Sequence, residues 1–226
     1  MVVVSSTKPA DSPAGFNKWG YRQLIGFFRP RLRIAALSLA AALVLPATGY
    51  GAGPKTQMEA KAERLEIRGG VLGHDTGFLM DAGPRQDVYA VNAEILFPSP
   101  AFLSLFFDPR PKAGFSLAPD ADGTGFIYAG LNWDIPVFGN WFLSAGIGGS
   151  LNNADRLTER DLRPGESKAT HRLLGCRALF HLSVGLGYQI TDTLNVHFYG
   201  DHHSNANLCD NNEGLDQWGF RLGYAF

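Results

Sequence analysis

The sequence predicts an all-β protein, an eight-stranded antiparallel up-and-down transmembrane β-barrel preceded by an N-terminal signal peptide. Beyond residue 53, apolar and polar residues alternate with period two in segments that turn residues separate. The segments number eight, and small bacterial outer-membrane barrels have an even number of strands. The composition combines 27 glycines and 12% aromatic residues with only 18% charged residues. It suits neither a disordered chain nor a helical membrane protein, which needs about 20 consecutive apolar residues per span.

The first expected element is a leader. An apolar run from Ile34 to Leu45 follows three arginines and continues through Pro46 into small residues. This order is typical of a secretory signal peptide. We expect a leader over residues 1–52 cleaved at about 49–53, a linker over 53–62 and a barrel over 63–226. An uncleaved anchor is the alternative, and the run is short for a span. Export to the bacterial outer membrane follows.

The strands come next in the chain. Turn residues bound each of them, and the expected ranges are Arg64–His74, Gln86–Phe97, Arg110–Leu117, Thr124–Ile135, Asn140–Asn152, Arg172–Ile190, Thr193–Ser204 and Asp216–Phe226. The second strand has an apolar side of Tyr89, Val91, Ala93, Ile95 and Phe97. Its other side carries Asn92 and Glu94. The fourth, fifth and sixth strands alternate in the same way, and in the sixth Arg177, His181 and Ser183 share the polar side.

A soluble β-sandwich would also alternate, so the polar side decides between the two folds. That side is rich in Gly, Ser, Asn and isolated charges, which suits a narrow polar lumen. Aromatic residues near strand ends match the girdles at membrane interfaces, namely Trp133, Trp141, Tyr188 and Phe226. A closed barrel also leaves no backbone edge unpaired in lipid. The barrel is therefore favoured over the sandwich.

Loop lengths orient the barrel. With a periplasmic N-terminus, the connections near 75–85, 118–123, 153–171 and 205–215 point outward, and short turns lie at Pro136–Gly139 and Thr191–Asp192. Long outer loops and short inner turns are usual in such barrels. The connection Pro98–Pro109 is an exception, because it is long and apolar for a periplasmic turn.

Three polar residues near the C-terminus fall on the lipid-facing side by parity. His202 and Ser204 continue the apolar series Leu194, Val196, Phe198 and Gly200, and Asp216 begins the series Trp218, Phe220, Leu222, Tyr224 and Phe226. The Cβ atoms of His202 and Ser204 would lie roughly 7 Å apart, which side chains can bridge. A serine becomes a nucleophile when a base takes its proton and a third group orients that base. The pattern indicates a serine hydrolase.

Non-catalytic explanations for these residues stay open. Histidine and serine are ordinary at strand ends, where they meet headgroups and water, and Asp216 could simply begin a strand after a turn. His203 competes for the role of base, but its parity points it to the lumen. Asp210 and Glu213 are alternative acids in a loop.

The same residues resemble a known family. The segments 202–206 (His-His-Ser-Asn-Ala), 212–216 (Asn-Glu-Gly-Leu-Asp) and 221–226 are similar to the C-terminal signature of the lipid A 3-O-deacylases, the PagL family. Weaker similarity covers 66–75, 91–97 and 128–133. The resemblance implies an outer-membrane barrel that hydrolyses the ester-linked 3-hydroxyacyl chain at position 3 of lipid A, from a site on its outer surface.

By motif position, Ser204 would be the nucleophile, His202 the general base and Asp216 the orienting acid. Asn205 would stabilise the oxyanion, and the resemblance implies no metal or cofactor. Two departures stand out. Asp216 replaces an expected glutamate, and Asn207 an expected glycine that would supply an oxyanion donor.

The expected partner is lipid A or lipopolysaccharide of the outer leaflet. A net charge of −1 argues against a nucleic-acid partner. The competing hypothesis is a non-enzymatic small barrel with a structural or adhesive role, and a solute pore is disfavoured because side chains fill a barrel of about eight strands. The sequence leaves open the oligomeric state, a homodimer included, and whether Cys176 and Cys209 form a disulfide or stay free.

Overall fold

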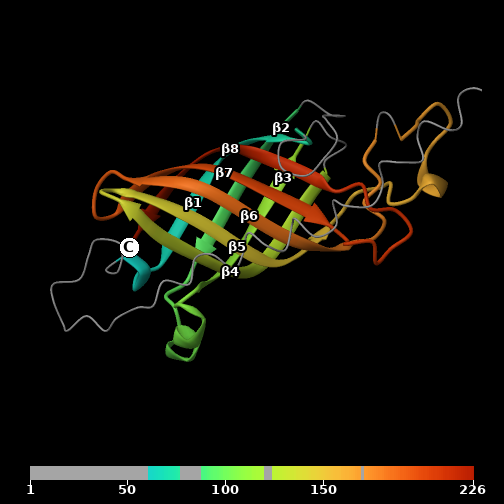
Figure 1. Cartoon of the computed structure of the whole chain (residues 1–226). Coiled ribbons are helices and arrows are strands. Elements are labelled where there is room, and N and C mark those ends of the chain that lie inside the picture. The colour runs from blue at the N-terminus through green and yellow to red at the C-terminus, as the bar shows by residue number, and fades with distance from the viewer. Residues whose placement is uncertain (1–60, 77–87, 120–123, 169–170) are drawn as a thin grey trace, which may run out of the picture. The chain divides into compact units, whose positions relative to one another are not determined.

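The computed structural model describes residues 61–76, 88–119, 124–168 and 171–226, and these contain a closed antiparallel barrel of eight strands (Figure 1). Each strand pairs with the next along the chain, and the last pairs with the first. The strands are β1 Glu66–His74, β2 Val88–Leu96, β3 Arg110–Ala118, β4 Thr124–Phe138, β5 Trp141–Asn152, β6 Ala178–Gln189, β7 Leu194–Ser204 and β8 Leu215–Ala225. The predicted fold class is confirmed. The expected leader over 1–52 and nearly all of the expected linker over 53–62 lie outside the described residues.

Within the described ranges, no helix is both long and apolar enough to cross a membrane.

The start of β6 differs from the prediction, because the strand begins at Ala178 and not at Arg172. The segment before it is held in a loop instead. Gly175 adopts a φ of +78°, its N–H donates to the Leu157 carbonyl, and Cys176 is disulfide-bonded. Arg177, which was expected to face the lumen, is exposed beyond the strand end. The sequence pattern here was misleading, since contacts with other loops override the alternation.

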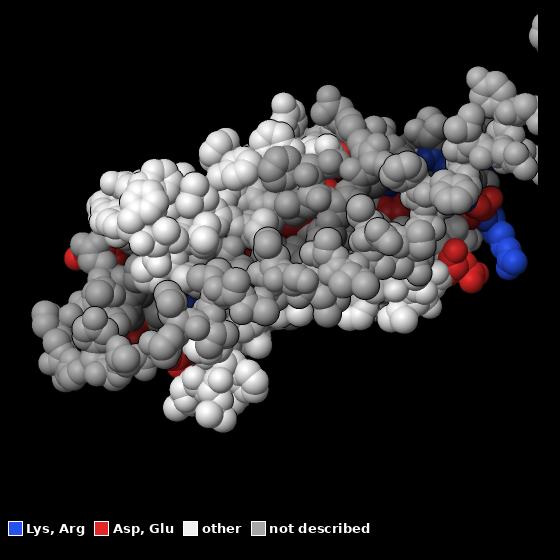
Figure 2. All heavy atoms as spheres, viewed as in Figure 1, with Lys and Arg blue, Asp and Glu red and all other residues white. Residues whose placement is uncertain are grey.

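The two faces of the strands differ as alternation predicts. In β8, Phe220 and Leu222 on the outer side are 63% and 59% exposed, whereas Arg221 between them is 1% exposed. The atoms that project from the described barrel wall in Figure 2 are mostly uncharged, and charged side chains project mainly at the end that carries the long loops. The outer wall is thus apolar and the lumen polar, which is the reverse of a soluble protein.

The lumen is closed by ion pairs. Glu66 accepts hydrogen bonds from Arg68 and Arg110, and Lys61 Nζ lies 3.2 Å from its carboxylate. Arg68 also pairs with Asp134. In a second group, the Glu94 carboxylate lies 3.2 Å from Lys112 Nζ and 3.4 Å from Arg221 Nη2. Buried charges are tolerated when they are paired in this way. Buried polar and charged side chains of the described strands occupy the interior.

The connection between β2 and β3 has an explanation in the structure. It contains the 3₁₀ helix η1, Ala101–Phe106, whose Phe102 and Leu105 are 72% and 86% exposed. The Trp133 indole N–H donates to the Phe106 carbonyl at 2.8 Å. Trp133 lies on the outer face of β4, so this bond holds η1 against the barrel wall near the end where the C-terminus lies (Figure 1). The apolar residues of this turn therefore extend the apolar outer surface of the barrel.

Candidate active site

A carboxylate and an imidazole meet at the outer rim of β7 and β8. His202 and Asp216 are directly opposite each other in the antiparallel ladder, and His202 Nδ1 lies 2.6 Å from Asp216 Oδ1. Asp216 is fully buried, and the His202 side chain is 9% exposed. A buried carboxylate that holds one ring nitrogen fixes the orientation of the imidazole and directs its other nitrogen, Nε2, away. The pair can therefore present a base to a substrate.

Parity and register place this pair on the lipid side. The neighbours of His202 along β7, Asp201 and His203, are fully buried in the lumen, and so is Gln217 next to Asp216. The partner of His202 on β6 is Leu182, an exposed apolar residue of the outer wall. His202 and Asp216 thus occupy outward positions, as the alternation predicted.

Ser204 is the last residue of β7 and has the same outward parity as His202. It is half-buried and lies opposite Phe180 on β6, whose side chain belongs to the exposed apolar wall. Within the described part of the chain, the one hydrogen bond of the His202 side chain is to Asp216, so Ser204 and His202 are neighbours on one face but are not bonded. Catalytic contacts of this kind often form only when substrate is bound.

Asn205 follows Ser204, and its donors are all engaged. Its backbone N–H donates to Asn212 Oδ1 at 3.0 Å, and its side-chain amide donates to the carbonyls of Leu174 and Asn211. These contacts join three segments around the end of β7. An oxyanion role for Asn205 would require one of these bonds to open, and that role stays a prediction.

The asparagine at position 207, where the resemblance led us to expect glycine, has a conformational explanation. Asn207 has a φ of +64°, in the left-handed region that favours glycine. Asparagine is among the residues that tolerate this region best, because its short polar side chain bonds locally. Here its Oδ1 accepts a hydrogen bond from Asn212 at 3.2 Å. Asparagine can therefore keep the backbone conformation that glycine would adopt.

Gly214 belongs to the site although the sequence indicated only a turn there. A Cβ atom at this position would lie 2.6 Å from His202 Cε1 and 3.2 Å from Nε2. No real side chain fits at that distance without displacing the imidazole from Asp216. A glycine two residues before the acid was a usable signal, but turn chemistry accounts for such a glycine equally well.

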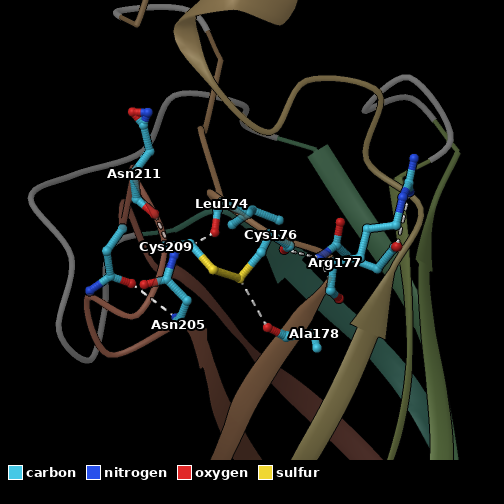
Figure 3. The surroundings of a disulfide bond; sticks show 9 residues. Leu174, Cys176, Arg177, Ala178, Asn205, Cys209 and Asn211 are labelled. Carbon is cyan, nitrogen blue, oxygen red and sulfur yellow. Dashed lines mark hydrogen bonds between the residues drawn. A yellow bond between two sulfur atoms is a disulfide. The ribbon is translucent and has the colours of Figure 1, made fainter.

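A disulfide secures the loops beside the site. Cys176, just before β6, is bonded to Cys209 in the loop after β7, with Cα atoms 6.1 Å apart (Figure 3). The alternative that the sequence left open is therefore settled in favour of a disulfide. Glu213, one of the alternative acids, uses its carboxylate to accept the Leu173 N–H at 2.8 Å, and Asp210 is exposed in the same loop. The Glu213 carboxylate therefore holds the loop in place.

The long loop after β5 has its own fixed geometry. Arg156 donates two hydrogen bonds of 2.6 Å to the Glu166 carboxylate, and the Arg163 N–H donates a third. These donors lower the pKa of Glu166 to about 2, chiefly through the Arg156 side chain. A bidentate ion pair between Arg156 and Glu166 therefore holds this loop near the outer end of the barrel.

An apolar groove starts at His202 and runs over the outer faces of neighbouring strands. Its volume is about 360 Å³, and its lining is Trp133, Ala145, Gly146, Ile147, Leu182, Ser183, Val184 and His202. Small residues on β5 leave this hollow between the larger side chains of β4 and β6.

His203, the competitor for the base, is turned into the lumen as its parity predicted. Its ring stacks on Phe126 with centroids 4.1 Å apart, and its Nδ1 lies 2.9 Å from Ser150 Oγ. It is fully buried and does not reach the outer face.

The fold and the site together define a class, the outer-membrane β-barrel proteins that carry an imidazole–carboxylate pair on the lipid-facing wall. Residues 124–225, which include β4 to β8 and all three predicted catalytic residues, match the family described as lipid A 3-O-deacylase (PagL). Over this C-terminal part, the chain is similar to that family.

The chain is also similar to solved structures. The crystal structure of the outer membrane enzyme PagL has a TM-score of 0.51 and 14% identity, over 71% of this chain and 99% of that chain. Neisserial surface protein A matches with a TM-score of 0.49 and 12% identity, over 72% and 97%. The N-terminal barrel domain of Pseudomonas aeruginosa OprF gives 0.48 and 11%, over 73% and 98%. A comparison with curated protein sequences found no match.

Proposed function

We propose that this protein removes the 3-O-linked hydroxyacyl chain of lipid A, using Ser204, His202 and Asp216 on the outer face of the barrel. The observation that carries the proposal is the 2.6 Å contact between His202 Nδ1 and Asp216 Oδ1 at an outward, buried rim position. A polar pair on a lipid-facing wall costs free energy. A substrate whose ester bonds lie at the same depth in the membrane would explain why the pair is present despite this cost.

The chemistry follows from the three groups. Ser204 Oγ attacks the ester carbonyl while His202 Nε2 takes the hydroxyl proton, and Asp216 stabilises the imidazolium. The tetrahedral intermediate collapses, His202 returns the proton to the sugar 3-oxygen, and an acyl-serine remains. Water, deprotonated by His202, then releases the 3-hydroxy fatty acid and restores Ser204. No step requires a metal.

The groove supports an acyl substrate. It leads from His202 over an apolar surface formed mainly by Trp133, Ile147 and Leu182, the surroundings that a hydrocarbon chain prefers. The sugar headgroup would then lie toward the loops after β5 and β7. Lipid A of the outer leaflet meets both requirements.

The direct test is mass spectrometry of lipid A from cells that express the protein. We expect the loss of one 3-hydroxyacyl chain with the wild-type protein, and unchanged lipid A with Ser204→Ala or His202→Asn. Ser99→Ala at the periplasmic end and His171→Asn in an outer loop are matched controls that should retain activity. Each barrel is checked for folding by its heat-dependent gel mobility. Unmodified lipid A in the presence of well-folded wild-type protein would leave the non-enzymatic barrel as the better reading.

A further inference from the structure

A cluster of metal-ligating side chains lies in the lumen behind the catalytic face. His181 on β6 is directly opposite His203 on β7, and Asp201 precedes His203 by two residues on the same lumenal side. All three side chains are fully buried. An aspartate and a histidine at alternate positions of one strand, with a histidine across the ladder, bring three ligands to one place.

The ligand atoms of this cluster are unsatisfied. His181 Nε2 lies 3.5 Å from Asp201 Oδ2, and His203 Nε2 lies 3.8 Å from Asp201 Oδ1. Within the described residues, both ring nitrogens of His181, Nε2 of His203 and Oδ1 of Asp201 have no hydrogen-bond partner. Fully buried polar atoms are almost always paired, so a group of them aimed at each other needs an explanation.

Charge singles out the same place. The other lumenal carboxylates in the described barrel, Glu66, Glu94 and Asp134, each have a lysine or arginine within ion-pair distance. Among the residues that the structure describes, Asp201 has only the two histidines within that distance. A cation bound between the three groups would supply a positive countercharge for the Asp201 carboxylate.

We propose that His181, Asp201 and His203 bind a divalent transition-metal ion, with zinc as the best match. One ligand atom from each residue lies within 4.8 Å of the others. Tetrahedral zinc with bonds of about 2.0–2.2 Å separates its ligand atoms by somewhat less than this. The two imidazoles are stacked with centroids 4.7 Å apart, so a tilt of the rings brings their nitrogens together around the ion.

Outer contacts already orient two of the ligands. His203 Nδ1 lies 2.9 Å from Ser150 Oγ, which leaves Nε2 for the metal. The Tyr199 hydroxyl donates to Asp201 Oδ2 at 3.0 Å. Protein metal sites commonly have such second partners, which fix the tautomer of the histidine and the rotation of the carboxylate.

The ion would have a structural role. Asp201 and His203 flank His202 in the chain, so a metal that joins them to His181 would tie β6 to β7 behind the catalytic imidazole. Metal binding of this kind contributes to the stability of the fold. It is independent of the ester chemistry, which takes place on the other side of the barrel wall.

The test measures metal in the full-length folded protein without substrate. Protein folded in detergent with a chelator is loaded with Zn²⁺ or Co²⁺, freed of excess metal and examined by elemental analysis and visible absorption. We expect stoichiometric zinc, and cobalt bands of a tetrahedral site, with an apparent affinity roughly 10-fold or more lower in His181→Gln and Asp201→Asn. His197→Gln, a lumenal histidine outside the cluster, is the matched control and should bind as the wild-type protein does.

Folding is checked in each case by heat-dependent gel mobility. Folded wild-type protein that binds neither metal overturns the proposal, and this outcome does not depend on any variant. Equal binding by wild type and a folded His181→Gln variant also overturns it.

Discussion

At the scale of single residues, Asp216 stands where the family resemblance led us to expect a longer glutamate. Register explains this, because His202 and Asp216 are direct partners across the β7–β8 ladder. The shorter side chain then reaches Nδ1 at 2.6 Å without a further methylene. The pairing of the two strands therefore accommodates the shorter acidic side chain.

Replacement of Asp216 by asparagine or alanine tests this role. Without the carboxylate, His202 loses its fixed tautomer and the charge that stabilises its imidazolium, so turnover should fall by roughly 10⁴-fold. The barrel should still fold, since the group lies at a strand end. The measurement is fatty-acid release from lipid A by purified protein in detergent. Turnover close to that of the wild type would show that another group orients the base.

Gly214→Ala is expected to lower kcat by about 100-fold with a smaller effect on KM. The added Cβ would lie 2.6 Å from His202 Cε1, and a displacement of about 1 Å in a catalytic group has a cost of this size. Gly149→Ala is the matched control, because a Cβ there meets only ordinary contact at 3.7 Å. Equal kcat values for the two variants would remove Gly214 from the site.

At the scale of elements, period two was sufficient to find all eight strands, because in a barrel each strand has one lipid-facing and one lumenal side. It failed before Ala178, where the alternation continues into the loop. There the backbone is held by Leu157, Glu213 and the disulfide to Cys209, all distant in sequence. The alternation of apolar and polar residues along a strand cannot reveal partners that are distant in the sequence.

The disulfide gives a prediction for the loops. In a Cys176→Ser/Cys209→Ser variant the barrel should fold, but the contacts of Asn205 with Leu174 and Asn211 should loosen, so that activity falls by about 10-fold. Dithiothreitol should reduce the activity of the wild-type protein to the same level and leave the variant unaffected. Full activity after complete reduction would show that the disulfide does not position the site.

At the scale of the whole molecule, the sequence predicted the barrel and the outward parity of three residues. It did not predict the lumenal ion pairs, because Glu66, Arg110 and Asp134 are far apart in the chain and meet only when the barrel closes. The apolar groove beside His202 was missed for the same reason, since its lining comes from four strands. The parity of a residue along its strand shows which side of the sheet it faces. Closure of the barrel decides which residues then come together on that side.

The central claim is that Ser204 is an activated nucleophile on the lipid-facing wall. Labelling of the folded protein with an alkyl fluorophosphonate, followed by peptide mass spectrometry, tests it most directly. We expect the phosphonyl group on Ser204 in the wild-type protein, and none in Ser204→Ala or His202→Asn. Label on a different residue, or undiminished label on Ser204 in His202→Asn, would contradict the account.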